Sequence, residues 1–200
     1  MRVRIRLLIS VVVLGFGSVA SASNLVQNGG FESNDFSHWS GTAAADVGSN
    51  GVTGSIFGID PFQGSYQAIF ATYTAETLTQ TLATTFNGSE TISFALADGG
   101  GGSPTDSFKV YFGGNLLATL SQTSGSYQTY SYQATATSTS TDLSFTMAHP
   151  SGGDWFLDAV SVTETVAAVP EPSTLALACV ACVSGLGHAA FRRRKAKLAA

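Results

Sequence analysis

The central part of the chain has almost no basic residues. Of the nine Lys and Arg among 200 residues, three precede residue 7 and five follow residue 191, so only Lys109 lies between residues 24 and 168. The same stretch holds 12 of the 13 Asp and Glu, and one cation against 12 anions leaves a net charge of −11, compared with −4 for the whole chain. A domain without cations cannot neutralise phosphates, which excludes nucleic acid and anionic lipid as partners. Its carboxylates favour solubility and can attract divalent cations.

Cysteine is also scarce. The two cysteines, Cys179 and Cys182, both lie in an apolar run near the C-terminus. Their C-x-x-C spacing has no second pair or ligand cluster beside it, so small polarizable residues in a membrane helix are the better interpretation. The stretch 24–166 therefore has no disulfide and must fold by burying a core, for which its length is sufficient.

The N-terminus has the pattern of a secretory signal peptide over residues 1–22. Three arginines precede an apolar segment from Leu7 to Phe16, and Ala20-Ser21-Ala22 is a small-residue cleavage site. A retained membrane anchor is the alternative interpretation of the same segment. Either way, the pattern predicts delivery to the Sec machinery and translocation of the residues that follow.

The C-terminus has three consecutive features. A linker over 167–174 contains Val169-Pro170-Glu171-Pro172, an apolar run spans 175–191, and a basic tail spans 192–200. The two prolines cannot continue a helix or a strand ladder, so the domain should end before them. The apolar run is long enough for a tilted transmembrane helix in a locally thinned bilayer, and the basic cluster that follows is a cytoplasmic stop-transfer signal. That cluster consists of Arg192, Arg193, Arg194 and Lys195.

This C-terminal arrangement resembles the PEP-CTERM sorting signal of Gram-negative bacteria. The resemblance implies an inner-membrane-anchored intermediate, cleavage by an exosortase, and release to the cell surface or the extracellular matrix. It describes how the protein is delivered, and the activity of the delivered domain has to be sought between the two ends.

The central stretch alternates apolar and polar residues over short segments that are separated by Gly, Asn, Asp, Ser and Pro. Thr, Val, Tyr and Phe dominate these segments, as is typical of strands. We expect strands at 66–73, 77–86, 91–96, 108–112, 116–120, 127–136, 143–148 and 155–163. The sequence therefore predicts an all-β fold, an antiparallel β-sandwich of the jelly-roll type without a substantial helix over 60–163.

Two strands allow a prediction of which face is buried. Gly113-Gly114 should form a tight hairpin turn, with Phe108, Val110 and Phe112 on one face of the strand before it. Tyr130 and Tyr132 share a face of a later strand. A row of tyrosines is compatible with a sugar platform, but an inner sandwich face is the more common use of such a row.

Both ends of this domain resemble jelly-roll carbohydrate-binding modules with a galactose-binding-like fold. The opening run Asn24-Leu-Val-Gln-Asn-Gly-Gly-Phe-Glu32 is followed by Trp39, and the closing run Asp154–Thr163 is similar to the last strand of such modules. In that family the opening glutamate and a closing aspartate hold a structural calcium ion. Carried over by position, these ligands are Glu32 and Asp158, while Ala159 stands where a second aspartate is common. An ordinary turn carboxylate and a hydrogen-bonded strand residue are the alternative roles.

The sequence shows no catalytic constellation. No G-x-S-x-G nucleophile motif occurs, Gly99–Gly102 lacks the lysine of a phosphate loop, and no tight cluster of carboxylates suggests a glycosidase. We expect His38 and His149 to be solvated loop residues. The domain is therefore predicted to be non-catalytic.

Three functions remain open: a surface or matrix protein that binds extracellular polysaccharide, a structural matrix protein of the same fold without a small ligand, and, less favoured, a glycan hydrolase. Sugar binding requires aromatic rings on an exposed face or loop rim. The candidate ligand-binding residues are Trp39, Tyr66, Tyr73, Tyr111 and Tyr127. Trp39 and Trp155 are expected to pack in the core, as large aromatic residues near strand ends usually do.

Overall fold

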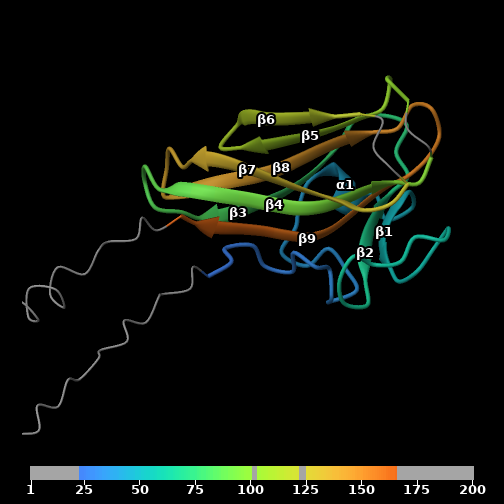
Figure 1. Cartoon of the computed structure of the whole chain (residues 1–200), viewed down its shortest axis with the longest axis horizontal. Helices are drawn as coiled ribbons and strands as arrows, with labels where there is room; N and C mark the ends of the chain where they lie inside the picture. Colours follow the sequence, from blue (N-terminus) through green and yellow to red (C-terminus); the bar gives the residue numbers. More distant parts are fainter. Residues whose placement is uncertain (1–22, 101–102, 122–124, 166–200) are drawn as a thin grey trace, which may run out of the picture. The chain divides into compact units, whose positions relative to one another are not determined.

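Two antiparallel sheets form the domain in the computed structural model, which describes residues 23–100, 103–121 and 125–165. The first sheet has the strand order β1-β2-β9-β4-β7 and the second has the order β3-β8-β5-β6 (Figure 1). The strands are β1 Asn50–Thr53, β2 Gln67–Phe70, β3 Glu76–Ala83, β4 Ser89–Asp98, β5 Ser107–Phe112, β6 Asn115–Leu120, β7 Gln128–Thr135, β8 Ser140–Ala148 and β9 Trp155–Glu164. The one described helix is a single turn, α1 Thr42–Ala45.

The predicted fold class is confirmed. Each of the eight expected strands is present, and β1 is a ninth that alternation did not reveal. No described residue between 60 and 163 is helical. The first segment also meets the last strand as expected, because Asn24 bridges to Thr163 and the Leu25 N–H donates to the Val162 carbonyl at 2.8 Å.

Alternating side chains from the two sheets form the core. Phe108, Val110 and Phe112 of β5 are buried as predicted, and positive φ angles at Gly113 and Gly114 close the β5–β6 hairpin. Phe94 of β4 lies at the centre, with ring centroids 5.4 Å from Tyr130 and from Phe145. The tyrosine row of β7 is therefore an inner face, half-buried against the core.

A β-bulge in β9 positions the residues that matter for the next section. The β4–β9 register shifts between Ser93, which pairs with Ser161, and Ala95, which pairs with Asp158. Ala159 and Val160 therefore both lie opposite Phe94, and Ala159 has a φ of 52°. One extra residue lets both Leu157 and Val160 face the core although they are three positions apart. The bulge thereby places Asp158 on the other side of the sheet, toward the loop that precedes β2.

The expected signal peptide, linker, transmembrane helix and basic tail lie outside the described residues. Within the described part of the chain, no helix is long and apolar enough to cross a membrane.

Candidate functional site

Glu32 and Asp158 meet at one loop, the loop 60–66 before β2. The backbone N–H of Gln63 donates to Asp158 Oδ2 at 3.0 Å, and the N–H groups of Ser65 and Tyr66 donate to Glu32 Oε1 at 2.9 and 3.1 Å. Each carboxylate thus fixes a different part of the same loop. The predicted pair does belong to one region, and its described contacts are backbone N–H groups.

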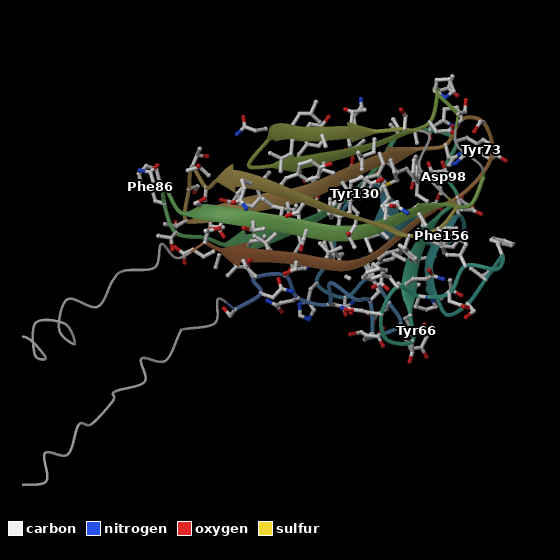
Figure 2. All side chains as sticks on the ribbon, in the orientation of Figure 1. Tyr66, Tyr73, Phe86, Asp98, Tyr130 and Phe156 are labelled. Atoms are coloured by element: carbon white, nitrogen blue, oxygen red, sulfur yellow. The ribbon has the colours of Figure 1, made fainter. Side chains whose placement is uncertain are left out.

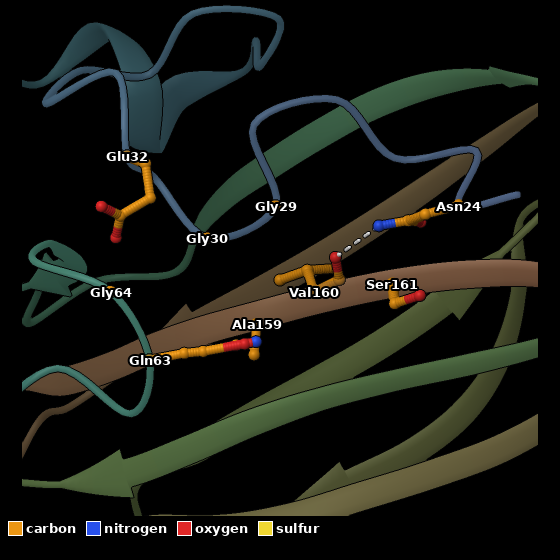
Figure 3. Close-up of a pocket in the computed structure, with 9 residues that line it drawn as sticks. All are labelled: Asn24, Gly29, Gly30, Glu32, Gln63, Gly64, Ala159, Val160 and Ser161. Carbon is orange, nitrogen blue, oxygen red and sulfur yellow. Dashed lines mark hydrogen bonds between the residues drawn. The ribbon is translucent and has the colours of Figure 1, made fainter.

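A cleft of about 570 Å³ separates this loop from the opening segment and β9 (Figure 3). Its lining residues are Asn24, Gly29, Gly30, Glu32, Gln63, Gly64, Ala159, Val160 and Ser161. A Cβ added to Gly30 would lie 3.8 Å from both Asp158 Oδ1 and Glu32 Cγ, and one on Gly64 would overlap the Glu32 carboxylate. A side chain at position 30 would make ordinary contacts, whereas Gly64 is required by the close approach of the Glu32 carboxylate.

The surroundings of Asp158 act on its pKa in both directions. Burial raises the pKa of Asp158; the N–H groups of Gln63, Ala159 and Phe62 act against this rise, and the negative charge of Glu32 adds to it. A carboxylate has about four lone-pair sites, so two or three N–H donors still leave capacity for a cation. Carboxylate oxygens are donors that Ca²⁺ prefers.

This loop and the turn that precedes it carry exposed aromatic side chains that our sequence reasoning missed. Phe57 is 71% exposed at the tip of a tight turn, and Phe62 is 44% exposed. The Phe62 ring lies 5.6 Å from that of Tyr127, which comes from the start of β7. We call Phe57, Phe62 and Tyr127 the aromatic rim.

The buried side chain of Gln67 binds the backbone on either side of Phe57 and the hydroxyl of Tyr127. Gln67 Nε2 donates to the carbonyls of Gly54 and Ile59, both at 2.9 Å, and Gln67 Oε1 accepts the Tyr127 hydroxyl at 2.6 Å. Burial raises the pKa of Tyr127, with a further upward contribution from the charge of Asp158. Since its hydroxyl is already paired with Gln67, Tyr127 can contribute to the surface mainly through its ring.

The five predicted ligand-binding aromatics are scattered. Trp39 is buried, stacks on Phe31 at 5.8 Å and donates its indole N–H to the Asn28 carbonyl, so it offers no open face. Tyr111 is half-buried on β5 of the other sheet. Tyr66 and Tyr73 lie well apart in Figure 2, and only Tyr73, at 72%, is exposed. Of the five, only Tyr127 belongs to the aromatic rim.

A second polar cluster corrects one of our predictions. His38 is an exposed loop residue as expected, but His149 is fully buried and the prediction of a solvated ring is wrong. Its Nε2 lies 3.0 Å from Asp98 Oδ1, and its Nδ1 lies 3.3 Å from Asp106 Oδ1. We call Asp98, Asp106 and His149 the Asp–His–Asp cluster.

Two glycine-rich turns make room for the histidine ring. A Cβ added to Gly100 or to Gly153 would lie 2.8 or 2.6 Å from His149 Cε1, which is too close for any side chain there. The sequence signal for this site was therefore present as Gly99–Gly102 and Gly152-Gly153. These runs indicated turns, but nothing in their spacing linked them to a histidine between two aspartates.

Ser151 completes a serine–histidine–aspartate contact, since its Oγ lies 3.1 Å from His149 Nδ1. The hydroxyl, however, donates to Asp106 Oδ2 at 2.6 Å, and the Ser151 N–H donates to Asp106 Oδ1 at 3.1 Å. Burial acts to raise the pKa of Asp106, but these Ser151 donors and the Ser103 N–H outweigh burial and lower it. Asp106 in its ionised form thus accepts both the hydroxyl proton and the backbone N–H of Ser151. Acyl transfer would need both groups for the reaction, so they are not available for it.

Comparison with known proteins agrees with both halves of this description. Residues 168–195 match the PEP-CTERM protein-sorting motif. No curated protein matches the chain at a significant level. The sequence therefore has a sorting signal of known type attached to a domain whose likeness must be sought in the fold.

Several solved structures share that fold. TmCBM61, solved in complex with β-1,4-galactotriose, is 19% identical with a TM-score of 0.57, over 72% of this chain and 99% of that one. The CBM22-1 xylan-binding domain of Paenibacillus barcinonensis Xyn10C is 17% identical with a TM-score of 0.54, over 76% and 100%. A family 16 carbohydrate-binding module is 15% identical with a TM-score of 0.54, over 70% and 100%. The chain thus has the jelly-roll fold of carbohydrate-binding modules.

Proposed function

We propose that this chain is an exported protein whose non-catalytic sandwich domain binds a glycan. The sorting motif supports passage through an inner-membrane intermediate, with an exosortase processing the tail and releasing the domain to the surface or matrix of a Gram-negative bacterium. Sec-dependent export follows from the signal-peptide pattern. Mass spectrometry of the exported protein should find the tail missing, and an intact 192–195 end at the surface would contradict processing.

The observation that carries the proposal is the aromatic rim. Exposed aromatic rings that gather on one surface often mark an interaction site, and the flat face of a sugar ring packs well on an aromatic face. Phe57 and Phe62 are exposed while Gln67 fixes the backbone and the Tyr127 ring behind them. The Phe62 and Tyr127 rings already pack against each other, so little of their side-chain entropy is lost when a ligand binds.

The charge of the domain narrows the class of glycan. Residues 24–168 have one lysine and 12 carboxylates, so a polyanionic polysaccharide would be repelled. We therefore propose a neutral polysaccharide. Because solved structures of the same fold were determined with β-1,4-galactotriose or are described as xylan-binding, β-1,4-galactan and xylan are suitable first probes.

Affinity electrophoresis tests this function directly. The purified protein should be retarded in native gels that contain β-1,4-galactan or xylan, and it should not be retarded by polygalacturonate. Phe62→Ser should abolish retardation, whereas Phe86→Ser should not, because Phe86 is also exposed, at 61%, but lies at the far end of the domain (Figure 2). Equal retardation of both variants would contradict the aromatic rim, and no retardation by any neutral glycan would favour a purely structural matrix protein. Release of reducing sugar, abolished by substitution within the domain, would favour a hydrolase instead.

We also propose that Glu32 and Asp158 bind a structural Ca²⁺ ion beside the aromatic rim. The proposal is supported by the convergence of the two carboxylates on loop 60–66 and by the effect of the Glu32 charge on Asp158. A cation between them would relieve this repulsion and tie the first segment to the last strand. It would also hold the loop that presents Phe62.

Thermal unfolding with and without calcium tests the ion. Binding to the folded state alone stabilises by mass action, by about 2.7 kcal/mol at 100 times the dissociation constant. Calcium should therefore raise the melting temperature, EDTA should lower it, and Glu32→Gln should abolish the difference. A melting temperature that does not respond to calcium would end this part of the proposal without affecting the glycan test.

A further inference from the structure

The Asp–His–Asp cluster lies where the two sheets of the sandwich come together. Asp98 ends β4 of the first sheet, and its register partner is Trp155 of β9. Asp106 directly precedes β5 of the second sheet, and His149 directly follows β8, whose Ala148 pairs with Ser107. Antiparallel pairing within each sheet thus brings the three residues to one end of the fold, although Asp98 and His149 are 51 positions apart in the sequence.

The cluster is enclosed. Asp98 and His149 are fully buried, and Asp106 is 1% exposed. The His149 ring packs against Trp155, with centroids 5.4 Å apart, while the backbones of Gly100 and Gly153 approach its Cε1 edge. Buried carboxylates are tolerated only when other groups compensate their charge.

Protein groups compensate the two carboxylates unequally. Asp106 accepts four hydrogen bonds or ring contacts, from Ser103, from His149 and twice from Ser151. Asp98 Oδ1 accepts the Gly100 N–H and faces His149 Nε2, both at about 3 Å. Asp98 Oδ2, in contrast, is buried with no hydrogen-bond partner among the described residues.

A proton on histidine does not resolve this imbalance. A neutral imidazole has one donor and one acceptor, so it cannot donate to both aspartates at once. An imidazolium could donate to both, yet two carboxylates would still exceed it by one negative charge, and Oδ2 of Asp98 would still have no partner. A second positive group would balance the charge, and among the described residues the cluster forms ion pairs with His149 alone, while Lys109 forms none.

We propose that the Asp–His–Asp cluster is a binding site for a divalent transition-metal cation of the zinc or manganese class. One ligand atom from each residue lies within 4.8 Å of the others, close to the spacing that two ligands of one ion can span. An imidazole nitrogen with carboxylate oxygens suits Zn²⁺ or Mn²⁺ better than Ca²⁺. One ring nitrogen binds the ion, and the other keeps its aspartate as the acceptor that orients the ring.

The ion fills the position at Asp98 Oδ2 that no protein donor reaches. Ser151 is exposed, and its Oγ lies within 3.1 Å of both His149 Nδ1 and Asp106 Oδ2, so it marks the side from which an ion enters. Bound there, the metal fastens the β4–β5 connection to the β8–β9 connection and so joins one sheet to the other. This role is separate from the calcium proposed at Glu32 and Asp158, where the donors are oxygen alone.

Metal titration of the purified, chelator-treated protein tests the proposal. Zn²⁺ is added to the folded protein and, in parallel, during refolding from denaturant, so that a closed fold cannot hide the site. We expect one Zn²⁺ per chain by calorimetry and elemental analysis, a higher melting temperature, and a visible Co²⁺ spectrum of a nitrogen- and oxygen-ligated ion. No bound zinc or cobalt by either route would overturn the proposal for the wild-type protein, whatever the variants do.

Variants separate this site from the other carboxylates. Asp98→Asn and His149→Gln should weaken Zn²⁺ binding at least about tenfold, whereas Glu32→Gln and the exposed Asp142→Asn should leave it unchanged. If a cluster variant fails to fold, the loss of the Co²⁺ spectrum on adding excess Zn²⁺ to wild type still reports the site. Zinc binding that survives in folded Asp98→Asn and His149→Gln, or that Ca²⁺ displaces with equal affinity, would contradict the assignment.

Discussion

Two groups of carboxylates lie near the start of β9, and they differ in the protein groups that compensate their charge. Glu32 and Asp158 receive backbone N–H groups from loop 60–66, so main-chain geometry satisfies them. The Asp–His–Asp cluster depends on a side-chain ring, and one oxygen of Asp98 receives nothing from the described residues. The first cluster shapes a loop that carries an exposed aromatic surface, whereas the second lies buried and joins two sheets.

This difference indicates where each cluster should be sensitive. The N–H groups that donate to these carboxylates belong to a largely exposed loop and can bind water instead, so the loss is moderate even though Asp158 itself is buried. Buried charges that share one ring have no such substitute. The comparison therefore predicts that substitution of His149 lowers the free energy of unfolding by a large amount and substitution of Asp158 by a moderate amount. Substitution of a buried carboxylate that has no partner should raise it.

The largest effect should follow removal of the histidine ring. His149→Asn in buffer with EDTA leaves Asp98 and Asp106 buried without a positive partner, which should lower the free energy of unfolding by about 3–5 kcal/mol. His38→Asn is the matched control, because His38 is exposed and asparagine tolerates its positive φ of 70°. Chemical denaturation measures both. Equal stability of the two variants would show that His149 does not compensate the charges of Asp98 and Asp106.

A moderate effect is expected at Asp158. Asp158→Ala leaves the N–H groups of Gln63 and Ala159 without their acceptor, and it should lower the free energy of unfolding by about 2 kcal/mol. Asp60→Ala, at an exposed aspartate of the same loop, should change it by less than about 0.5 kcal/mol. Increased hydrogen exchange at residues 60–66 in the first variant alone would locate the loss in the loop. Unchanged exchange there would contradict the anchoring role.

A gain in stability is expected at Glu90, a buried carboxylate outside both clusters. Neither of its oxygens has a hydrogen-bond partner among the described residues, and its cross-strand neighbour is Glu164. Burial raises the pKa of Glu90 above 4.5, and the charge of Glu164 raises it further. The folded state therefore binds this proton more tightly than the unfolded state, so stability is lost as pH rises from about 4.5 through the raised pKa.

Glu90→Gln should remove this pH dependence and stabilise the protein by about 1 kcal/mol at pH 7. Melting temperatures of the wild type and the variant between pH 4 and pH 8 provide the measurement. The two curves should converge at the acidic end and separate above it. A variant that is less stable at pH 7 would mean that Glu90 has a partner which the hydrogen-bond pattern does not reveal.

The smallest effect on stability belongs to the aromatic rim. Phe62 is 44% exposed, so Phe62→Ser should change the free energy of unfolding by less than about 0.5 kcal/mol while it abolishes retardation by glycan. Loss of folding in this variant, measured by near-ultraviolet circular dichroism, would show that the ring has a structural role instead.

Sequence patterns predicted the strands because most of them alternate, and they predicted the β5–β6 hairpin because two glycines close it. The elements that escaped have no such pattern: α1 and β1 lie in a stretch of Ala, Gly, Ser and Asn with little hydrophobic periodicity. Glu32 and Asp158 could be paired through a resemblance at the two ends of the domain. The partners of His149 could not, since they become neighbours only through strand pairing in both sheets.

Sequence patterns did not reveal the aromatic rim for a related reason. Tyrosines on strands attracted attention because strands have faces, but Phe57 and Phe62 lie in the segment before β2, where spacing gives no direction. The contact of Phe62 with Tyr127, which comes from the β7 side of the fold and is held by Gln67, became visible only in the structure.

Chemical-shift mapping with ¹⁵N-labelled protein tests glycan binding at the aromatic rim most directly. Titration with neutral β-1,4-linked galacto- or xylo-oligosaccharides should shift amide resonances of residues 54–67 and 127 in a saturable way. The Phe86 end of the domain should not respond, and Phe62→Ser should remove the shifts while its spectrum stays that of a folded protein. Saturable shifts confined to another face, such as the outer surface of β3 and β8, would contradict the account and place the ligand elsewhere.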